Sequence, residues 1–260
     1  MGSRSRCHPA DNRTASGRTP GHGLMSGPEN VPTLDSLLTT STWTHGLSAD
    51  EMEVVRKTIT ERSVRAGGYV CRRGDAVEHW FGVIEGFVKL CSNSQGGRAV
   101  TFTCVASGGW FGEGSLLKDE PRRFDAIALR DTRSACLPRA TFLWLLENSM
   151  AFNRFLVNQL NERLGQFVAM LEFERTLAPD IRVARCLSVL FNPLLYPRTG
   201  PRLAISQEEI ASLCGLSRQT VNQALHALER QGWLRVDFRG ITVTDLHGLQ
   251  TFASLDDNHG

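Results

Sequence analysis

The chain has no run of about 18 consecutive apolar residues, the length that a membrane-spanning helix needs. Its N-terminus is polar and rich in arginine, without the apolar stretch that a secretory signal contains. The seven cysteines are odd in number and scattered, and no two of them form a CxxC motif. This pattern favours reduced thiols over a disulfide scaffold or a zinc site. We therefore expect a cytoplasmic protein without a membrane segment.

The formal net charge of +2 does not by itself indicate nucleic-acid binding, which has to be argued from local residues. The length of 260 residues corresponds to one or two domains, at roughly 150 residues each. Residues 1–32 have almost no apolar content, so we expect a disordered tail there, and Met25 is a second candidate start of translation.

The sequence pattern of residues 64–138 is typical of a β domain. Short apolar-alternating runs are separated by Gly pairs and Gly-Asp at intervals of about 7 to 12 residues, which predicts a β-sandwich or barrel. Residues 80–84, 87–90 and 100–103 have good strand compositions. Before them, the spacing of Met52, Val55 and Ile59 predicts a short amphipathic helix over residues 50–62.

A long helix is predicted next, because residues 142–177 contain no proline. Apolar residues recur there in steps of three and four, and they are Phe152, Leu156, Leu160, Leu164, Phe167 and Leu171. This spacing places them on one face of a helix about 25 residues long. Two interpretations remain open: the stripe forms a parallel helix dimer, or it packs within its own chain.

The C-terminal part contains the signals of two short helices joined by a tight turn. Asp180 is the expected N-cap of a helix over residues 181–191. Ser206 and Glu209 form a capping box, Gly215 permits a tight turn, and Ser217 caps a second helix. This is the order of a helix-turn-helix unit, and residues 234–238 and 241–245 predict a hairpin wing after it.

The second helix of this unit presents side chains suited to reading DNA. Arg pairs bidentately with guanine, and Gln or Asn with adenine. The outward residues are Arg218, Gln219, Asn222, Gln223 and His226. A solvated helix face is the alternative interpretation, but such a face ordinarily carries Glu and Lys rather than amides.

A Gly-punctuated β region, a long helix and the segment ISQEEIASLCGLSRQTVNQALHALE together resemble the Crp/Fnr superfamily of bacterial transcription regulators. The resemblance covers about residues 35–250. It implies an α+β fold with a cyclic-nucleotide-binding-type β-roll (jelly-roll, or double-stranded β-helix) over residues 33–148. A dimerisation helix over residues 149–177, a winged helix-turn-helix domain over residues 178–252 and a tail over residues 253–260 would follow.

The function implied is a homodimeric, sequence-specific transcription regulator modulated by a small effector, and not an enzyme. Its partners would be pseudo-palindromic double-stranded DNA, a second copy of itself and RNA polymerase. The alternative is a cyclic-nucleotide-binding module that acts through a protein partner, which leaves the helix-turn-helix unexplained. The predicted DNA-binding residues are Ser206, Ser217, Arg218, Gln219, Asn222, Gln223 and Arg239. Of these, Arg239 lies in the wing, where we expect phosphate contacts from it and from Arg235.

The segment FGEGSLLKDEPRRFD resembles the phosphate-binding cassette of cyclic-nucleotide domains. By position, Glu113 matches the carboxylate that holds the ribose hydroxyl, and Arg123 the arginine that pairs with the cyclic phosphate. The predicted effector-binding residues are Gly112, Glu113, Gly114, Ser115, Arg122, Arg123 and Phe167. The alternative is that Glu113 and Arg123 only pair with each other and hold the roll together.

Departures from the cassette pattern argue against cyclic AMP itself. Phe124 stands where cyclic-AMP binders have Ser or Thr, and Phe167 and Val168 stand where a Thr-Ser pair holds adenine. The effector is therefore left open between a cyclic nucleotide, another small anionic molecule and no ligand. An iron–sulfur cluster is not expected, because only Cys7 lies near the N-terminus, and His79 is a weak candidate for haem. No catalytic or metal-binding residue is predicted.

Overall fold

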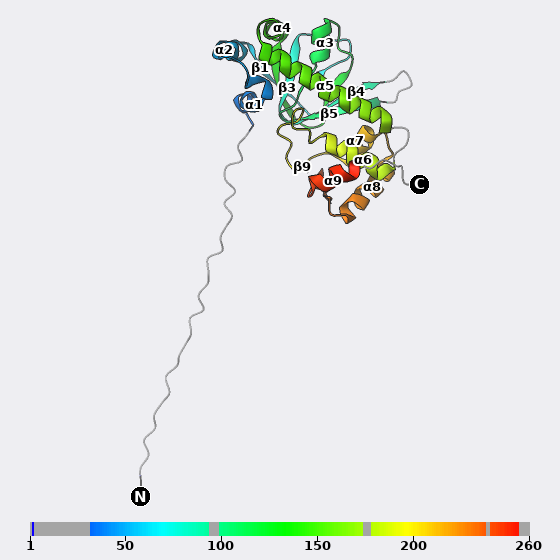
Figure 1. Ribbon diagram of the computed structural model, residues 1–260. Coiled ribbons are helices and arrows are strands. Elements are labelled where there is room, and N and C mark those ends of the chain that lie inside the picture. The colour runs from blue at the N-terminus through cyan, green and yellow to red at the C-terminus, as the bar shows by residue number, and fades with distance from the viewer. Residues whose placement is uncertain (1, 3–31, 94–98, 174–177, 238–239, 255–260) are drawn as a thin grey trace. The chain divides into compact units, whose positions relative to one another are not determined.

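Two four-stranded antiparallel sheets form a β-roll in the N-terminal half (Figure 1). Their strand orders are β1-β8-β3-β6 and β2-β7-β4-β5. The strands are β1 Thr60–Val64, β2 Tyr69–Cys71, β3 His79–Glu85, β4 Phe87–Asn93, β5 Ala99–Ala106, β6 Trp110–Phe111, β7 Asp125–Ala128 and β8 Thr132–Pro138. The computed structural model describes residue 2 and residues 32–93, 99–173, 178–237 and 240–254. The tail predicted for residues 1–32 lies almost wholly outside these ranges.

Both faces of β3 are buried, which explains its nearly continuous apolar sequence. Phe81 and Val83 pack between the two sheets, whereas Trp80 and Ile84 pack on the opposite face against helices. All three predicted strand runs fall inside β3, β4 and β5. A β-roll thus forms where alternating runs and glycine turns predicted a β-sandwich or barrel, as the family resemblance implied.

Helices cover the outer face of the first sheet. Before the roll come α1 Leu34–Thr40, a 3-10 helix Thr42–Thr44, and α2 Ala49–Thr58; after it comes α4 Arg139–Asn148. The helix expected over residues 50–62 ends at Thr58, and the prediction was wrong beyond it. Residues from Thr60 onward pair with β8 instead, because Thr60 begins the strand β1, and β-branched residues favour strands.

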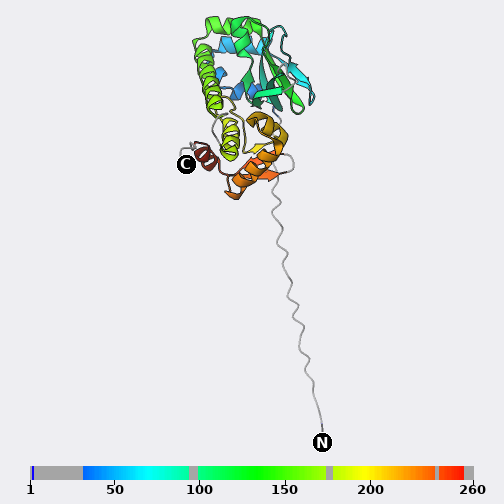
Figure 2. The same ribbon diagram turned by 90° about the vertical axis from the view of Figure 1, so that its right-hand side faces the viewer.

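The long helix α5, Met150–Phe173, has 24 residues and runs along the outside of the roll (Figure 2). Its predicted apolar stripe splits in two. Phe152 and Leu156 are buried against the roll, whereas Leu160, Leu164 and Phe167 are exposed. The side chain of Leu171 and residues 174–177 lie outside the described part of the chain. Packing within the chain therefore accounts for the first half of the stripe only.

The C-terminal part contains α6 Pro179–Val189, α7 Gln207–Cys214, α8 Arg218–Arg230, α9 Leu246–Ala253 and a small sheet of order β10-β11-β9. The sheet consists of β9 Arg202–Leu203, β10 Leu234–Asp237 and β11 Gly240–Val243. The N-cap of α6 is Ala178 rather than Asp180, so that prediction was wrong. Proline fixes φ near the helical value and lacks the N–H that a first turn leaves unpaired, so Pro179 starts the helix one residue before Asp180.

The structure confirms the α+β fold class, with an N-terminal roll, a long helix and a C-terminal winged helix-turn-helix. Among the helices that the structure describes, none combines the length and the apolar character needed to cross a membrane.

Candidate DNA-binding face and effector cavity

The helix-turn-helix is held by local hydrogen bonds that the sequence encodes. Ser206 Oγ accepts the N–H of Glu209 at 3.2 Å, and Glu209 Oε2 accepts the N–H of Ser206 at 2.6 Å, so the predicted capping box forms. Gly215 ends α7 with φ 62°, where a residue with a side chain is disfavoured. Ser217 Oγ then accepts the N–H of Thr220 at 3.1 Å and caps α8. These caps fix the angle at which α8 leaves the turn.

One face of α8 is buried and the other is exposed. Val221, Ala224, Leu225 and Leu228 pack into the core of this domain. Arg218, Gln219 and Gln223 are exposed, and their side chains make no hydrogen bond to another described residue. Their donors and acceptors are available to base edges.

Asn222 is the exception among the predicted reading residues. It is half-buried, and its Oδ1 accepts a hydrogen bond from Gln207 Nε2 at 2.9 Å. This bond joins α7 to α8, so Asn222 helps to position α8. A base contact by Asn222 stays a prediction, as do the contacts assigned to Ser206 and Ser217, which are both exposed.

The wing carries further positively charged side chains. Arg235 on β10 is exposed, and Arg202 on β9 pairs with Asp237 at 3.4 Å. Arg239 lies outside the described residues. The wing is tied to α8 through Glu229, whose Oε1 accepts the N–H of Val236 at 2.8 Å. That hydrogen bond holds the pKa of Glu229 below its usual value.

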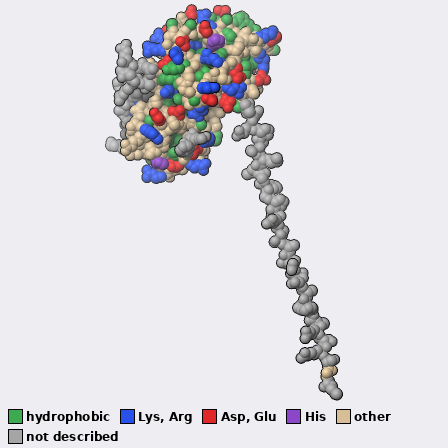
Figure 3. All heavy atoms as spheres, turned by 180° about the vertical axis from the view of Figure 1, so that it is seen from behind, with side chains coloured by type: hydrophobic (Ala, Val, Ile, Leu, Met, Phe, Trp, Pro, Cys, Tyr) green, Lys and Arg blue, Asp and Glu red, His purple; other side chains and the backbone are tan. Residues whose placement is uncertain are grey.

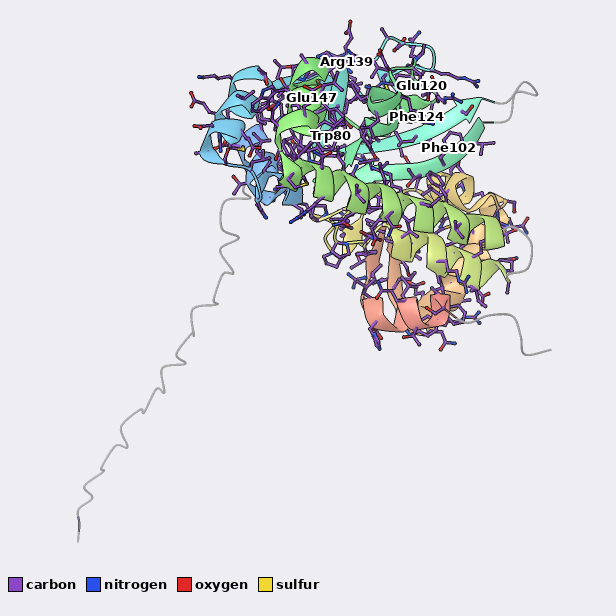
Figure 4. The ribbon with its side chains drawn as sticks, turned by 45° about the horizontal axis from the view of Figure 1, so that its top comes forward. Trp80, Phe102, Glu120, Phe124, Arg139 and Glu147 are labelled. Atoms are coloured by element: carbon purple, nitrogen blue, oxygen red, sulfur yellow. The ribbon has the colours of Figure 1, made fainter. Side chains whose placement is uncertain are left out.

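A cavity of about 310 Å³ lies between the roll and α5, next to the predicted cassette. Seven apolar side chains contribute most of its lining, namely Leu90, Phe102, Phe111, Phe124, Leu160, Leu164 and Phe167. Figure 4 shows Phe102 and Phe124 on the part of the roll that faces α5. Of the predicted effector residues, Gly112, Glu113, Gly114 and Phe167 line this cavity, and Ser115 does not.

Glu113 sits at the centre of a buried polar network. Its Oε1 accepts from Arg163 Nε of α5 at 2.9 Å, and its Oε2 accepts from Trp80 Nε1 at 3.3 Å. Arg163 also donates to the carbonyl of Trp110 and interacts with Tyr196, whose hydroxyl lies 3.1 Å from Thr103 Oγ1. Burial opposes the charge on Arg163, but Glu113 and Tyr196 outweigh it and raise the pKa of this guanidinium.

The two arginines of the cassette lie elsewhere. Arg123 is exposed and its Nε donates to Glu120 at 2.8 Å, so the Glu113–Arg123 pair offered as an alternative does not form. Arg122 is buried and donates to the carbonyls of Gly112 and His79. Gly112 has φ 97°, a backbone conformation that favours glycine, and a Cβ there would lie 2.4 Å from Arg122 Nη1. An anion contact by either arginine stays a prediction.

Arg163 is a residue of the cavity that was not predicted from the sequence. A usable signal was present, because Arg163 lies four residues before Phe167 and hence on the same helix face. No group of three His, Cys, Asp or Glu side chains could hold a metal ion within the described ranges. Burial raises the pKa of the strand thiols Cys71, Cys91, Cys104 and Cys136, that of Cys71 to about 11. These thiols are therefore poor nucleophiles.

The surface seen in Figure 3 carries Lys and Arg side chains intermixed with Asp and Glu. This mixture agrees with the net charge of +2. Positive charge that binds DNA must therefore come from local groups of basic residues and not from the net charge of the whole chain.

Comparison with known proteins identifies the family. One family model, the cyclic nucleotide-binding domain, matches residues 61–149, and a second, the Crp-like helix-turn-helix domain, matches residues 181–252. The cyclic AMP receptor protein of Thermus thermophilus is 31% identical over 209 residues, which cover 80% of this chain and 95% of that relative. The chain belongs to the Crp/Fnr family of transcription regulators.

Other relatives agree with this assignment. The CRP-like cAMP-activated global transcriptional regulator of Mycobacterium tuberculosis is 27% identical over 223 residues, 83% of this chain and 98% of that relative. A CRP/FNR-family regulator from Thermus thermophilus has a crystal structure that matches with a TM-score of 0.56 and 26% identity, covering 75% of this chain and 99% of the other. The fold also matches FixK2 of Bradyrhizobium japonicum, with a TM-score of 0.64 at 24% identity, over 76% and 99% of the two chains.

This Crp/Fnr protein is thus a DNA-binding transcription regulator with an N-terminal domain of the effector-binding type. The prediction from the sequence is confirmed at this level. A regulatory module that acts only through a protein partner is not favoured, because the Crp-like helix-turn-helix model accounts for residues 181–252.

Proposed function

We propose that this Crp/Fnr protein is a homodimeric regulator that reads pseudo-palindromic DNA with α8 and responds to a small effector in the β-roll. It would act in the cytoplasm, together with RNA polymerase, and without enzymatic activity of its own. The observation that carries the proposal is the exposed Arg218–Gln219–Gln223 set at the N-terminal end of a capped helix. Arg and Gln at this end are the side chains that recognise guanine and adenine.

The dimer is proposed from the exposed apolar side chains of α5. Val157, Leu160, Leu164, Phe167 and Val168 are 65%, 38%, 61%, 43% and 47% exposed. Val157, Leu160, Leu164 and Phe167 follow one another in steps of three and four, and Val168 lies four residues after Leu164. This spacing is that of a coiled-coil seam, which buries such side chains against a second helix. A two-fold dimer would place its reading helices about one helical turn of DNA apart.

The effector site is proposed to be the cavity at Glu113 in the roll of residues 33–148. Relatives of this chain are named for cyclic AMP, which makes a cyclic nucleotide or another small anion one class of ligand to test. Arg122 and Arg123 line a hollow together with Arg73 and would supply the positive charge for such an anion.

Fluorescence anisotropy of the full chain with a selected palindromic site tests the proposed function. We expect saturable binding that falls steeply with salt, because phosphate contacts release counterions. A half-site alone should bind much more weakly than the palindrome. Equal affinity for half-site and palindrome would contradict reading by a dimer.

A further inference from the structure

The effector cavity is nearly neutral. The described side chains that line it include one carboxylate, Glu113, and one guanidinium, Arg163, and these two pair with each other at 2.9 Å. Their side chains are only 4% and 12% exposed. Because the charges offset each other, a ligand meets little net field in this cavity.

No cation in the described lining is left for a phosphate. The Arg123 side chain is 72% exposed and pairs with Glu120, outside the cavity. Arg122 donates to two backbone carbonyls, and together with Arg123 it lines a separate hollow rather than this cavity. A phosphate would have to lose its hydration beside the buried Glu113 carboxylate, and burying an uncompensated charge is costly.

Apolar surface dominates the remaining wall. Phe102, Phe111 and Phe124 come from the roll, and Leu160, Leu164 and Phe167 come from α5. Ligand cavities of about 300 Å³ or more with such linings take apolar molecules and use a few polar groups for orientation. The polar groups here are the paired Glu113 and Arg163 and the hydroxyl of Thr103.

The cavity adjoins a second hollow that reaches the DNA-binding half. Phe102, Thr103 and Phe167 line both, and the second hollow continues to Val189 on α6 and Leu213 on α7. Gln166 also lines this second hollow, and its amide nitrogen is buried without an acceptor among the described residues. A ligand carbonyl placed there would satisfy that donor.

We propose that this cavity takes a neutral, mainly apolar molecule with an aromatic or alkyl body and one carbonyl or hydroxyl group, rather than a cyclic nucleotide. The inference rests on the proposed function, since it takes the cavity as the effector site. The ligand body packs among the phenylalanines and α5. Its polar group bonds to the Glu113–Arg163 pair or to Gln166. A ligand held this way contacts side chains shared by the roll, the dimer seam and the helix-turn-helix half.

The test uses the full chain and N-phenyl-1-naphthylamine, a neutral probe whose fluorescence rises in apolar surroundings. We expect saturable binding of one probe per chain. Phe124→Arg and Phe102→Arg should each lower the probe affinity at least tenfold, because each places a guanidinium in the apolar wall. Both positions are half-buried, so the two variants check each other against misfolding. Tyr69→Arg is the matched control, since Tyr69 is 40% exposed and does not line the cavity.

Cyclic AMP is added as a competitor in the same titration. Failure of cyclic AMP to displace the probe at concentrations up to the millimolar range supports the proposal. Displacement at micromolar cyclic AMP would overturn the ligand class and leave the cavity as the effector site. Probe binding that survives both cavity variants, or no probe binding at all, would overturn the site for apolar ligands. DNA binding by the wild type, measured in parallel, tests the proposed function separately.

Discussion

Arg163 of α5 forms a buried ion pair with Glu113, with 2.9 Å between Nε and Oε1. Glu113 is the first residue of helix α3, which spans Glu113–Lys118. The pair joins the cassette to the long helix, and Tyr196 extends it toward the C-terminal part. Two buried charges of opposite sign stabilise each other only while both are present.

Removing one partner of this pair should therefore be more damaging than removing both. Arg163→Met should lower the free energy of unfolding by about 3–5 kcal/mol, because it leaves a buried carboxylate without its counter-charge. The double variant Glu113→Gln with Arg163→Met should recover a large part of that loss. Urea unfolding of the wild type, both single variants and the double variant measures these differences. A double variant no more stable than Arg163→Met would show that breaking the ion pair does not cause the loss in the free energy of unfolding.

The exposed apolar side chains of α5 lead us to expect a dimer formed through this helix. Leu164→Glu places a charge at a position that is 61% exposed in one chain and buried in the proposed dimer, so we expect monomers. The variant should fold, since Leu164 does not belong to the core of its own chain. Light scattering coupled to gel filtration gives the mass directly.

Val100→Glu is the control for that variant, because Val100 is also an apolar, exposed residue (50%) but lies on β5 and not on α5. It should remain dimeric. A Leu164→Glu variant that keeps the mass of a dimer would place the interface elsewhere.

Glu229 predicts a pH dependence of stability in the DNA-binding part. The N–H of Val236 holds the pKa of Glu229 below its usual value, so the stabilisation is present above the unfolded pKa. It is lost as the pH falls through the folded pKa, where the carboxylate takes up a proton. Glu229→Gln should therefore lower Tm at pH 7, and the difference from the wild type should vanish toward pH 3. Glu208→Gln, at an exposed position in the first turn of α7, should shift Tm little at either pH.

Local signals explain which parts of the fold were predictable. Ser206 and Glu209 cap the start of α7, Gly215 ends that helix, and Ser217 caps the start of α8. Each of these residues acts on backbone no more than four residues away, so the sequence alone indicated the helix-turn-helix. The division of the α5 stripe was not predictable, because Phe152 is covered by Trp43 and Trp80 from distant segments.

The contacts within the cavity were even harder to predict from the sequence than the division of the α5 stripe. Glu113 and Arg163 are 50 residues apart, and periodicity says nothing about which cation reaches a given carboxylate. Arg123 was a reasonable expectation from its position in the cassette, yet Glu120 lies three residues before it and pairs with it on the surface. The two-residue strand β9 was missed because so short a segment has no pattern of its own.

The wing should contribute affinity without sequence preference. Arg235→Ala should weaken binding to all DNA sequences alike and reduce the salt slope by about one, since it removes a single phosphate contact. Anisotropy titrations at several salt concentrations measure the slope. A change in base preference would instead place Arg235 among the reading residues.

Selection of binding sites from random DNA shows whether the N-terminal end of α8 reads bases. The wild type, Arg218→Ala and Arg235→Ala are compared under identical salt. We expect a palindromic consensus for the wild type, and loss of preference at one base pair in each half-site for Arg218→Ala. The cost should be about 1–3 kcal/mol per half-site. Arg235→Ala should select the wild-type consensus. An unchanged consensus from Arg218→Ala would remove this residue from the set that reads bases. No consensus from the wild type would mean that α8 does not read DNA sequence.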